Sequence, residues 1–177
     1  MSVGKQEPNR VFLIGPMGVG KTTIGKILAS DLKMDFFDTD LEIERRTGAT
    51  VSWIFDVEGE SGFRNREEDL VEELTKINSL VLATGGGVVI REKNRQTLSN
   101  RGFVVYLRAN FEELLERMRG DKKRPLLQVE NPKLKLRQLL REREPLYLAT
   151  ANLVIDTRGL CSKLIAKQLT VKLKELL

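Results

Sequence analysis

The sequence of 177 residues contains no histidine and only one cysteine, Cys161. Without histidine, a proton acceptor that works near neutral pH must be a carboxylate, a lysine, a tyrosine or that single thiol. A metal site must likewise be built from oxygen atoms, which suit magnesium, calcium or manganese. One cysteine supports neither a disulfide framework nor a cysteine-based zinc site within the chain.

Long hydrophobic stretches are missing too. The longest segment without a charged residue, residues 77–90, contains three consecutive glycines, whereas a membrane-spanning helix needs about 18 or more apolar residues. The N-terminal residues 1–10 lack the apolar core of a signal peptide. With 41% hydrophobic and 31% charged residues, the composition is that of an ordinary globular protein. We therefore expect one domain over residues 1–177, cytoplasmic, monomeric and not bound to a membrane.

Aromatic residues are few, at 6% of the chain, although the net charge is +5. The basic residues are interspersed with acidic ones, and the one dense basic cluster is RGDKKR at residues 119–124. A nucleic-acid-binding surface would need a basic patch, usually with aromatic residues for single strands. We expect no nucleic-acid partner, because small anionic substrates explain the same excess of positive charge.

Short apolar segments alternate with helical patterns along the chain. This alternation predicts an α/β fold, a parallel sheet with helices on both faces, whose ligands bind at the carboxyl ends of the strands. The expected strands are residues 10–14, 34–38, 79–84, 103–107 and 151–156. The expected helices are residues 21–32, 41–48, 62–78, 109–119 with Asn110 as N-cap, 133–147 and 160–177, while residues 50–55 are read as helix or irregular structure.

A glycine-rich loop follows the first expected strand. Residues 15–23, GPMGVGKTT, match the pattern G-x-x-x-x-G-K-[ST]. Glycines let the backbone N–H groups point at phosphates, and the following helix adds its positive N-terminus. Lys21 can reach the β and γ phosphates of a nucleotide, and the Thr22 hydroxyl can ligate magnesium. The expected ligands of ATP and Mg²⁺ in this loop are Gly18, Val19, Gly20, Lys21, Thr22 and Thr23.

Other motifs indicate which class of nucleotide enzyme this is. A GTPase switch needs a DxxG segment after a strand and an NKxD motif, but DVEG at residues 56–59 follows an expected helix and NKxD is missing. An ATP-driven machine would usually be larger or act in arrays. A small-molecule kinase instead needs a pocket for the phosphate acceptor, and several features of the sequence are typical of one.

Two carboxylates, Asp38 and Asp40, flank a threonine after the second expected strand. In an extended chain, side chains two residues apart point to the same face. Such close negative charges repel each other, so a positive charge is required nearby. We expect the magnesium ion of the nucleotide to supply it, with structural pairing of either aspartate to a lysine as the alternative.

Three glycines at residues 85–87 end the third expected strand and expose consecutive backbone N–H groups to a ligand. Arg64 and Glu67 are three residues apart on an expected helix and can touch. Because Glu67 lies on or beside the apolar stripe, it needs a partner, and Arg64 is the candidate. A surface ion pair is the alternative, since such pairs are common.

Arg143 falls on the apolar face of the helix expected at residues 133–147. An unpaired guanidinium is costly there. It can bind a planar carboxylate through two parallel hydrogen bonds. Alternatively its long stem can reach solvent, or Glu142 or Glu144 can offset its charge.

These features together resemble the shikimate kinases. The motifs GPMGVGKT, DTD, FRNRE, TGGG, RPLL and REPLY occur in the order and approximate spacing of that family, over residues 11–156. The resemblance implies transfer of the ATP γ-phosphate to the 3-hydroxyl of shikimate, in the synthesis of chorismate and aromatic amino acids. It also implies a P-loop NTPase-like fold with strand order 2-3-1-4-5, a mobile lid at about residues 116–132 and an acceptor-binding helical region at about residues 40–67.

The resemblance further implies a role for each matching residue. Asp40 would contact the acceptor hydroxyl as its base or orienter, and Asp38 would help Thr22 to hold Mg²⁺. Lys21 and the lid residue Arg124 would assist catalysis, with Arg124 and Arg117 also contacting ATP. The shikimate-binding residues would be Asp40, Arg64, Gly85, Gly86, Gly87 and Arg143.

Two other functions remain open on the sequence alone. A gluconate-type or nucleotide kinase would not need two arginines converging on one carboxylate. An inactive homologue that binds ATP or a protein partner would be expected to have lost a catalytic lysine or aspartate, whereas Lys21, Asp38, Asp40 and Arg124 are all present.

Overall fold

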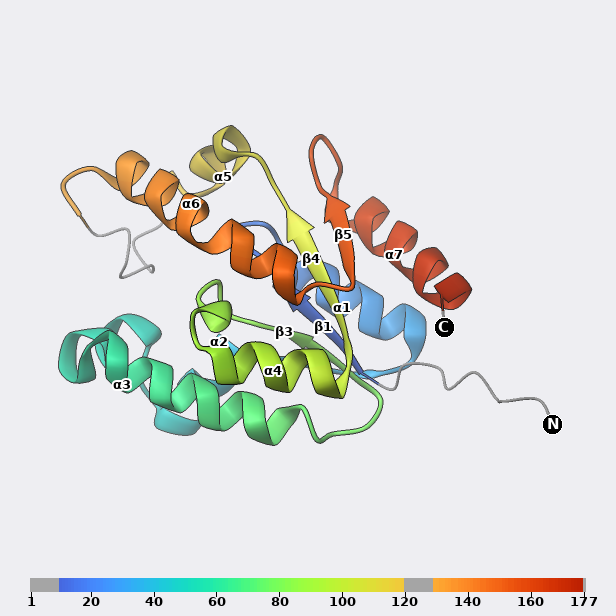
Figure 1. The fold of residues 1–177 in the computed structure, drawn as a ribbon, viewed down its shortest axis with the longest axis horizontal. Coiled ribbons are helices and arrows are strands. Elements are labelled where there is room, and N and C mark those ends of the chain that lie inside the picture. The colour runs from blue at the N-terminus through green and yellow to red at the C-terminus, as the bar shows by residue number, and fades with distance from the viewer. Residues whose placement is uncertain (1–9, 120–128, 177) are drawn as a thin grey trace.

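Five parallel strands form the central sheet of the computed structural model, which describes residues 10–119 and 129–176 (Figure 1). Their order is β2-β3-β1-β4-β5, and all neighbouring strands are parallel. The strands are β1 (Arg10–Ile14), β2 (Asp35–Asp38), β3 (Leu80–Ala83), β4 (Phe103–Arg108) and β5 (Leu153–Asp156). The fold class and strand order predicted above are confirmed.

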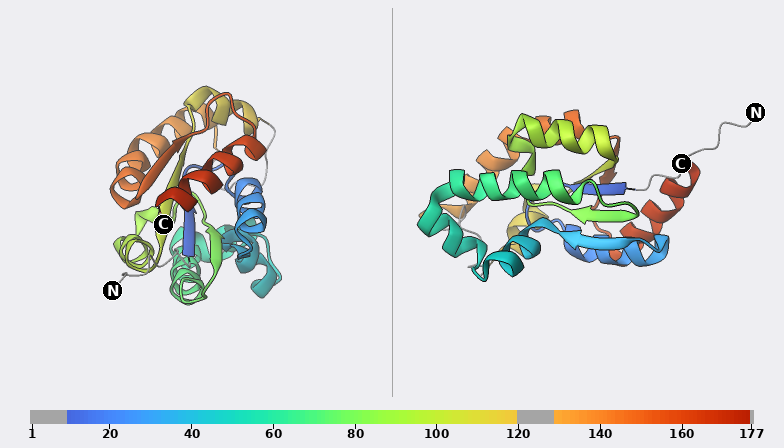
Figure 2. Two further views of the ribbon diagram at one scale, coloured as in Figure 1. Left: turned by 90° about the vertical axis from the view of Figure 1, so that its right-hand side faces the viewer. Right: turned by 90° about the horizontal axis from the view of Figure 1, so that it is seen from below.

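Helices cover both faces of this sheet (Figure 2). They are α1 (Lys21–Leu32), α2 (Thr39–Thr47), α3 (Val51–Leu74), the 3-10 helix η1 (Val88–Ile90), α4 (Glu92–Arg101), α5 (Phe111–Arg117), α6 (Pro132–Thr150) and α7 (Ser162–Leu176). Asn110 caps α5 as predicted, its side chain accepting from the backbone N–H of Glu113 at 2.8 Å.

The core divides into two layers because side chains alternate along each strand. On β1, Val11 and Leu13 join the layer that contains residues of α1 and α7. Phe12 and Ile14 join the layer that contains residues of α3 and α4. All four are fully buried, so the sheet is held from both sides, and the carboxyl ends of β1, β2 and β3 form a fixed edge.

Two helices differ from the expectation. Helix α4 was not predicted, since Leu98 is its only apolar residue and a hydrophobic stripe is therefore missing. Helix α3 begins at Val51 and ends at Leu74, and it is kinked at Gly59, whose φ of 72° and ψ of 177° are not helical. The kink separates the segment at residues 50–55, left open above, from the amphipathic helix that carries Arg64.

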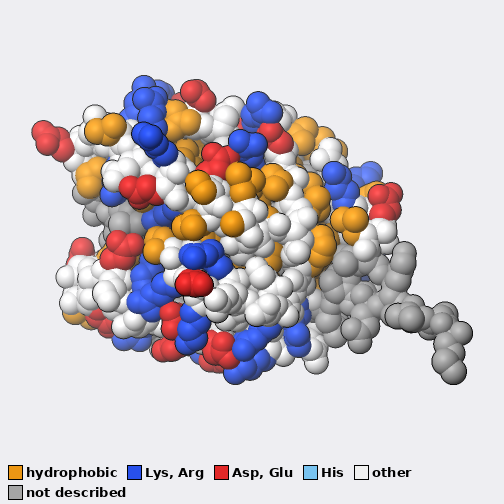
Figure 3. Space-filling view, in the orientation of Figure 1, with side chains coloured by type: hydrophobic (Ala, Val, Ile, Leu, Met, Phe, Trp, Pro, Cys, Tyr) orange, Lys and Arg blue, Asp and Glu red, His pale blue; other side chains and the backbone are white. Residues whose placement is uncertain are grey.

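Basic and acidic side chains are interspersed on the face seen in Figure 3. Among the described residues, no helix has the length and apolar character that crossing a membrane demands. Arg124, with residues 120–128 of the predicted lid, lies outside the described residues.

We predict that Gly59→Ala lowers the free energy of unfolding by about 1–3 kcal/mol, because its φ and ψ values are essentially restricted to glycine. Open space surrounds the position of the added methyl group, so the loss would come from the backbone alone. Urea unfolding monitored by circular dichroism measures it. Gly48→Asn is the matched control, since φ of 69° and ψ of 13° are left-handed helical values that asparagine tolerates. Equal losses in the two variants would contradict this account.

Candidate active site

The phosphate loop connects β1 to α1 in the conformation that a nest of N–H groups requires. Gly18 and Gly20 have φ values of 79° and 101°, in the left-handed region that favours glycine. A methyl group at Gly15 would lie 2.5 Å from the carbonyl oxygen of Leu107, so the loop also packs closely on β4. The Lys21 ammonium folds over the loop and donates to the carbonyl oxygens of Gly15 and Pro16, at 2.7 Å each.

A cavity of about 340 Å³ opens beside this loop. Arg117, at the end of α5, donates to the carbonyl oxygens of Gly18 and Val19 at 3.3 and 3.1 Å. This contact places Arg117 against the loop, whereas Arg119, just after the end of α5, pairs with Glu116 at 3.3 Å. The cavity is lined by Met17, Gly18, Gly20, Lys21, Thr22, Thr23, Asp38, Asp40, Leu41, Thr84, Gly85 and Gly86.

Asp38 and Asp40 meet at this cavity, but the extended geometry expected for them is wrong. Helix α2 already begins at Thr39, so Asp40 lies in its first turn. Asp38 is the N-cap, and its Oδ1 accepts from the backbone N–H groups of Asp40 and Leu41 at 3.0 and 3.2 Å. The two carboxylates are therefore separated by the start of a helix, whose positive end stabilises negative charge.

The second oxygen of Asp38 faces the phosphate loop. The Thr22 hydroxyl donates to Asp38 Oδ2 at 2.5 Å. No group of three or more histidine, cysteine or acidic residues among the described residues could hold a metal. A hydroxyl and one carboxylate are nonetheless a donor set that fits magnesium, which typically takes one or two protein ligands and keeps water and phosphate oxygens as the rest.

Within the described part of the chain, Asp40 and Glu67 each present a buried oxygen atom without a hydrogen-bond partner, Oδ1 and Oε1 respectively. Both atoms would lie 2.8 Å from a methyl group added at Gly85, so a side chain at that glycine would displace them. Burial, then the negative charges of Glu67 and Asp38, raise the pKa of Asp40 to about 7, against the opposing charges of Lys21 and Arg64. Asp40 can therefore gain or lose a proton near neutral pH.

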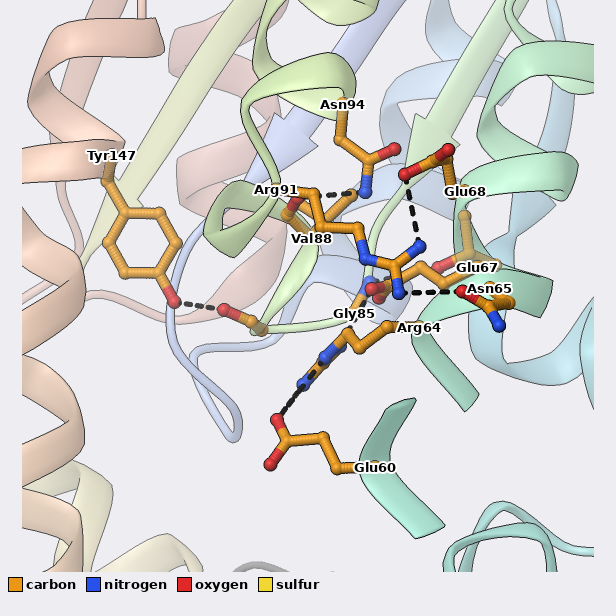
Figure 4. Close-up of polar contacts among 12 residues, drawn as sticks. Glu60, Arg64, Asn65, Glu67, Glu68, Gly85, Val88, Arg91, Asn94 and Tyr147 are labelled. Carbon is orange, nitrogen blue, oxygen red and sulfur yellow. Dashed lines mark hydrogen bonds and ion pairs between the residues drawn. The ribbon is translucent and has the colours of Figure 1, made fainter. Parts of the chain in front are cut away.

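Arg64 and Glu67 form a buried ion pair and not a surface one (Figure 4). Arg64 Nη1 donates to Glu67 Oε2 at 2.7 Å, and the residues are only 6% and 0% exposed. The half-exposed Glu60 contacts the other side of the guanidinium at 3.3 Å. A methyl group at Gly87 would lie 2.1 Å from Arg64 Nη2, so the guanidinium packs directly on the glycine segment, residues 85–87.

Arg143 reaches the same region from α6. It is 5% exposed, and among the described residues no carboxylate forms an ion pair with it. Of the two acids left open above, Glu144 pairs with Arg108 at 2.8 Å and Glu142 accepts from Gln138. The pKa of Glu67 is raised by burial, and the charges of Arg64 and Arg143 both oppose that rise. The charges of both arginines therefore reach the Glu67 carboxylate.

Two contacts of the glycine segment come from residues to which the sequence analysis gave no role. The hydroxyl of the fully buried Thr39 accepts from the backbone N–H of Gly85 at 2.9 Å. The hydroxyl of Tyr147 donates to the carbonyl of Gly86. Thr39 lies between the two aspartates of the DTD motif, and Tyr147 is the last residue of the REPLY motif. Their positions within these motifs were the only features of the sequence analysis that could have indicated a role for them.

The sequence model of the family described as "Shikimate kinase" matches residues 17–174. The chain is similar to the shikimate kinase of Vibrio parahaemolyticus, with 52% identity over 96% of this chain and 98% of that protein. It is also similar to shikimate kinase 1 of Sodalis glossinidius, with 55% identity over 92% and 95% of the two chains. A solved structure of Acinetobacter baumannii shikimate kinase in complex with shikimate shares 50% identity and a TM-score of 0.92, covering 96% of this chain and 95% of that one. The chain belongs to the shikimate kinase family.

Proposed function

We propose that this protein transfers the γ-phosphoryl group of ATP to the 3-hydroxyl of shikimate, which yields shikimate 3-phosphate and ADP for the synthesis of chorismate and aromatic amino acids. The observation that supports the proposal is that Arg64 and Arg143, which lie on two different helices, are both buried and that the charges of both act on Glu67. Family membership supports the same reaction.

The acceptor's carboxylate would bind between Arg64 and Arg143. Guanidinium groups match a planar carboxylate through paired hydrogen bonds, and burial strengthens such bonds because water competes less. Backbone N–H groups of Gly85, Gly86 and Gly87 would complete the acceptor site. Among hydroxylated small molecules, this arrangement favours ring acids over neutral sugars.

Asp40 would receive the proton of the acceptor hydroxyl or orient that hydroxyl for attack. Its Oδ1 is buried without a partner, and a pKa of about 7 is close to the value at which a general base is most useful. Phosphoryl transfer depends mainly on positioning and charge neutralisation, so a modest base suffices. Lys21, and Arg124 outside the described residues, would stabilise the charge on the transferring group.

The nucleotide would lie along the phosphate loop. Its phosphates would meet the N–H groups of residues 18–23, and Arg117 would lie against the adenine. Thr22 and Asp38 would hold Mg²⁺, because their oxygen atoms lie side by side. The bound ion would neutralise charge on the phosphates.

We further propose that the protein is one kinase domain over residues 1–177, with a lid at about residues 116–132 and an acceptor-binding region at about residues 40–67. It would act as a cytoplasmic monomer whose partners are small molecules, without nucleic acid or membrane. The interspersed basic and acidic side chains on the face seen in Figure 3 are consistent with the proposed absence of a nucleic-acid partner.

A panel of hydroxylated compounds tests the proposed reaction. We expect ATP consumption in a coupled assay with shikimate and Mg²⁺, and little with gluconate, glycerol or nucleoside monophosphates, because these do not present a carboxylate and a ring hydroxyl at the required spacing. Consumption should cease with EDTA. Equal turnover with gluconate, or none with shikimate, would contradict the proposal.

We predict that Asp40→Asn lowers kcat by about 100-fold or more, the usual contribution of a positioned base, while ATP still binds. We expect steady-state kinetics to show this decrease in kcat, and we expect the dissociation constant for ATP to be unchanged. Asp35→Asn is the matched control, since Asp35 is an exposed aspartate at the other end of β2. Full turnover by Asp40→Asn would contradict the role of Asp40.

A further inference from the structure

Tyr147 makes a contact that the reaction described above does not use. Its hydroxyl donates a hydrogen bond to the carbonyl oxygen of Gly86 (Figure 4). The side chain is 1% exposed, and its ring stacks on Tyr106 with 5.0 Å between ring centroids and 24° between planes. Burial raises the pKa of Tyr147, against the opposing charge of Arg143, so the hydroxyl keeps its proton and remains a donor.

Gly86 occupies the middle of the glycine segment and lies close to the phosphate loop. A methyl group added there would lie 3.1 Å from the backbone nitrogen of Met17. The Gly86 carbonyl and the Gly87 N–H belong to one planar peptide group and point in opposite directions. Holding the oxygen toward Tyr147 therefore also fixes the direction of the Gly87 N–H.

The same tyrosine lies one helical turn after Arg143 on α6, so the two side chains share a face of that helix. The charges of Arg143 and Arg64 both act on the Tyr147 hydroxyl, which places it near both guanidinium groups. Arg64 in turn packs against Gly87. The hydroxyl thus connects the helix that carries Arg143 to the backbone segment on which Arg64 rests.

We infer that Tyr147 is a positioning residue for the acceptor: its hydroxyl sets the spacing between Arg143 and the glycine segment, and thereby the affinity for the acceptor carboxylate. This inference rests on the proposed function. Among the described residues, the Tyr147 hydroxyl donates to Gly86 and not to a residue of the phosphate loop, so we expect ATP binding to depend little on it.

Tyr147→Phe tests the inference because it keeps the ring that stacks on Tyr106 and removes only the hydroxyl, which donates to Gly86 and also interacts with Arg143. A buried carbonyl then loses its partner, and we expect KM and Kd for shikimate to rise about five- to tenfold. KM for ATP and kcat should stay within about twofold of the unmodified protein, since the lost interactions lie outside the phosphate loop. Tyr106→Phe is the matched control, because its hydroxyl belongs to the same stacked tyrosine pair and, among the described residues, forms no hydrogen bond with Gly86.

The outcomes separate this inference from the proposed reaction. If the unmodified protein fails to phosphorylate shikimate, the proposed function itself is wrong. If it does so and Tyr147→Phe keeps the unmodified Kd for shikimate, only the inference is overturned. Equal increases in KM for ATP and for shikimate, or an equal effect of Tyr106→Phe, would indicate general destabilisation and would overturn it as well. A rise confined to shikimate in Tyr147→Phe supports it.

Discussion

The buried ion pair between Arg64 and Glu67 is the constraint on which the site depends. Both side chains come from the part of α3 that follows the kink at Gly59, and the carboxylate is completely buried. Removing either partner would leave a buried charge without compensation, which is strongly destabilising. The pair therefore fixes the Arg64 guanidinium against Gly87, and a second buried guanidinium, Arg143, adds positive charge beside it. We propose that an anionic acceptor pairs with Arg143, which forms no ion pair with a carboxylate among the described residues, and with the Arg64 guanidinium beside it.

Around that pair, the carboxyl ends of three strands bring the reacting groups together. β1 leads into the phosphate loop, β2 into Asp38 and the first turn of α2, and β3 into the glycine segment. The charges of Lys21, in the phosphate loop, and of Arg64, in the proposed acceptor site, both lower the pKa of Asp40, so Asp40 lies between the two proposed sites. A transferred phosphoryl group would cross this same gap.

Local pattern was enough to predict the individual strands, the phosphate loop and the Arg64–Glu67 contact, because each depends on residues near one another in sequence. The strand order pairs residues far apart in sequence, and it came from the family resemblance. The burial of the Arg64–Glu67 pair, and its approach to Arg143, depend on how α3 and α6 pack, which spacing does not contain. Helix α4 was not predicted because Leu98 is its only apolar residue, so its sequence has no hydrophobic stripe. Asp38 and Asp40 were expected in an extended segment. Asp38 is instead the N-cap of α2, so the helix begins at Thr39 and contains Asp40. Family resemblance supplied the roles of the acceptor residues.

Calorimetric titration of shikimate in the absence of ATP, on a double-mutant cycle of Arg64→Ala and Arg143→Ala, tests the central claim most directly. Once circular dichroism shows that each single variant is folded, its Kd should be raised by at least about tenfold, as expected for a lost charged hydrogen-bonding partner. The increase in Kd for the double variant should be smaller than the product of the two single increases, because both guanidinium groups would hold one carboxylate. Arg66→Ala, which removes an exposed arginine of the same helix, should leave Kd unchanged. Unchanged Kd in either single variant, or fully independent effects, would contradict the account.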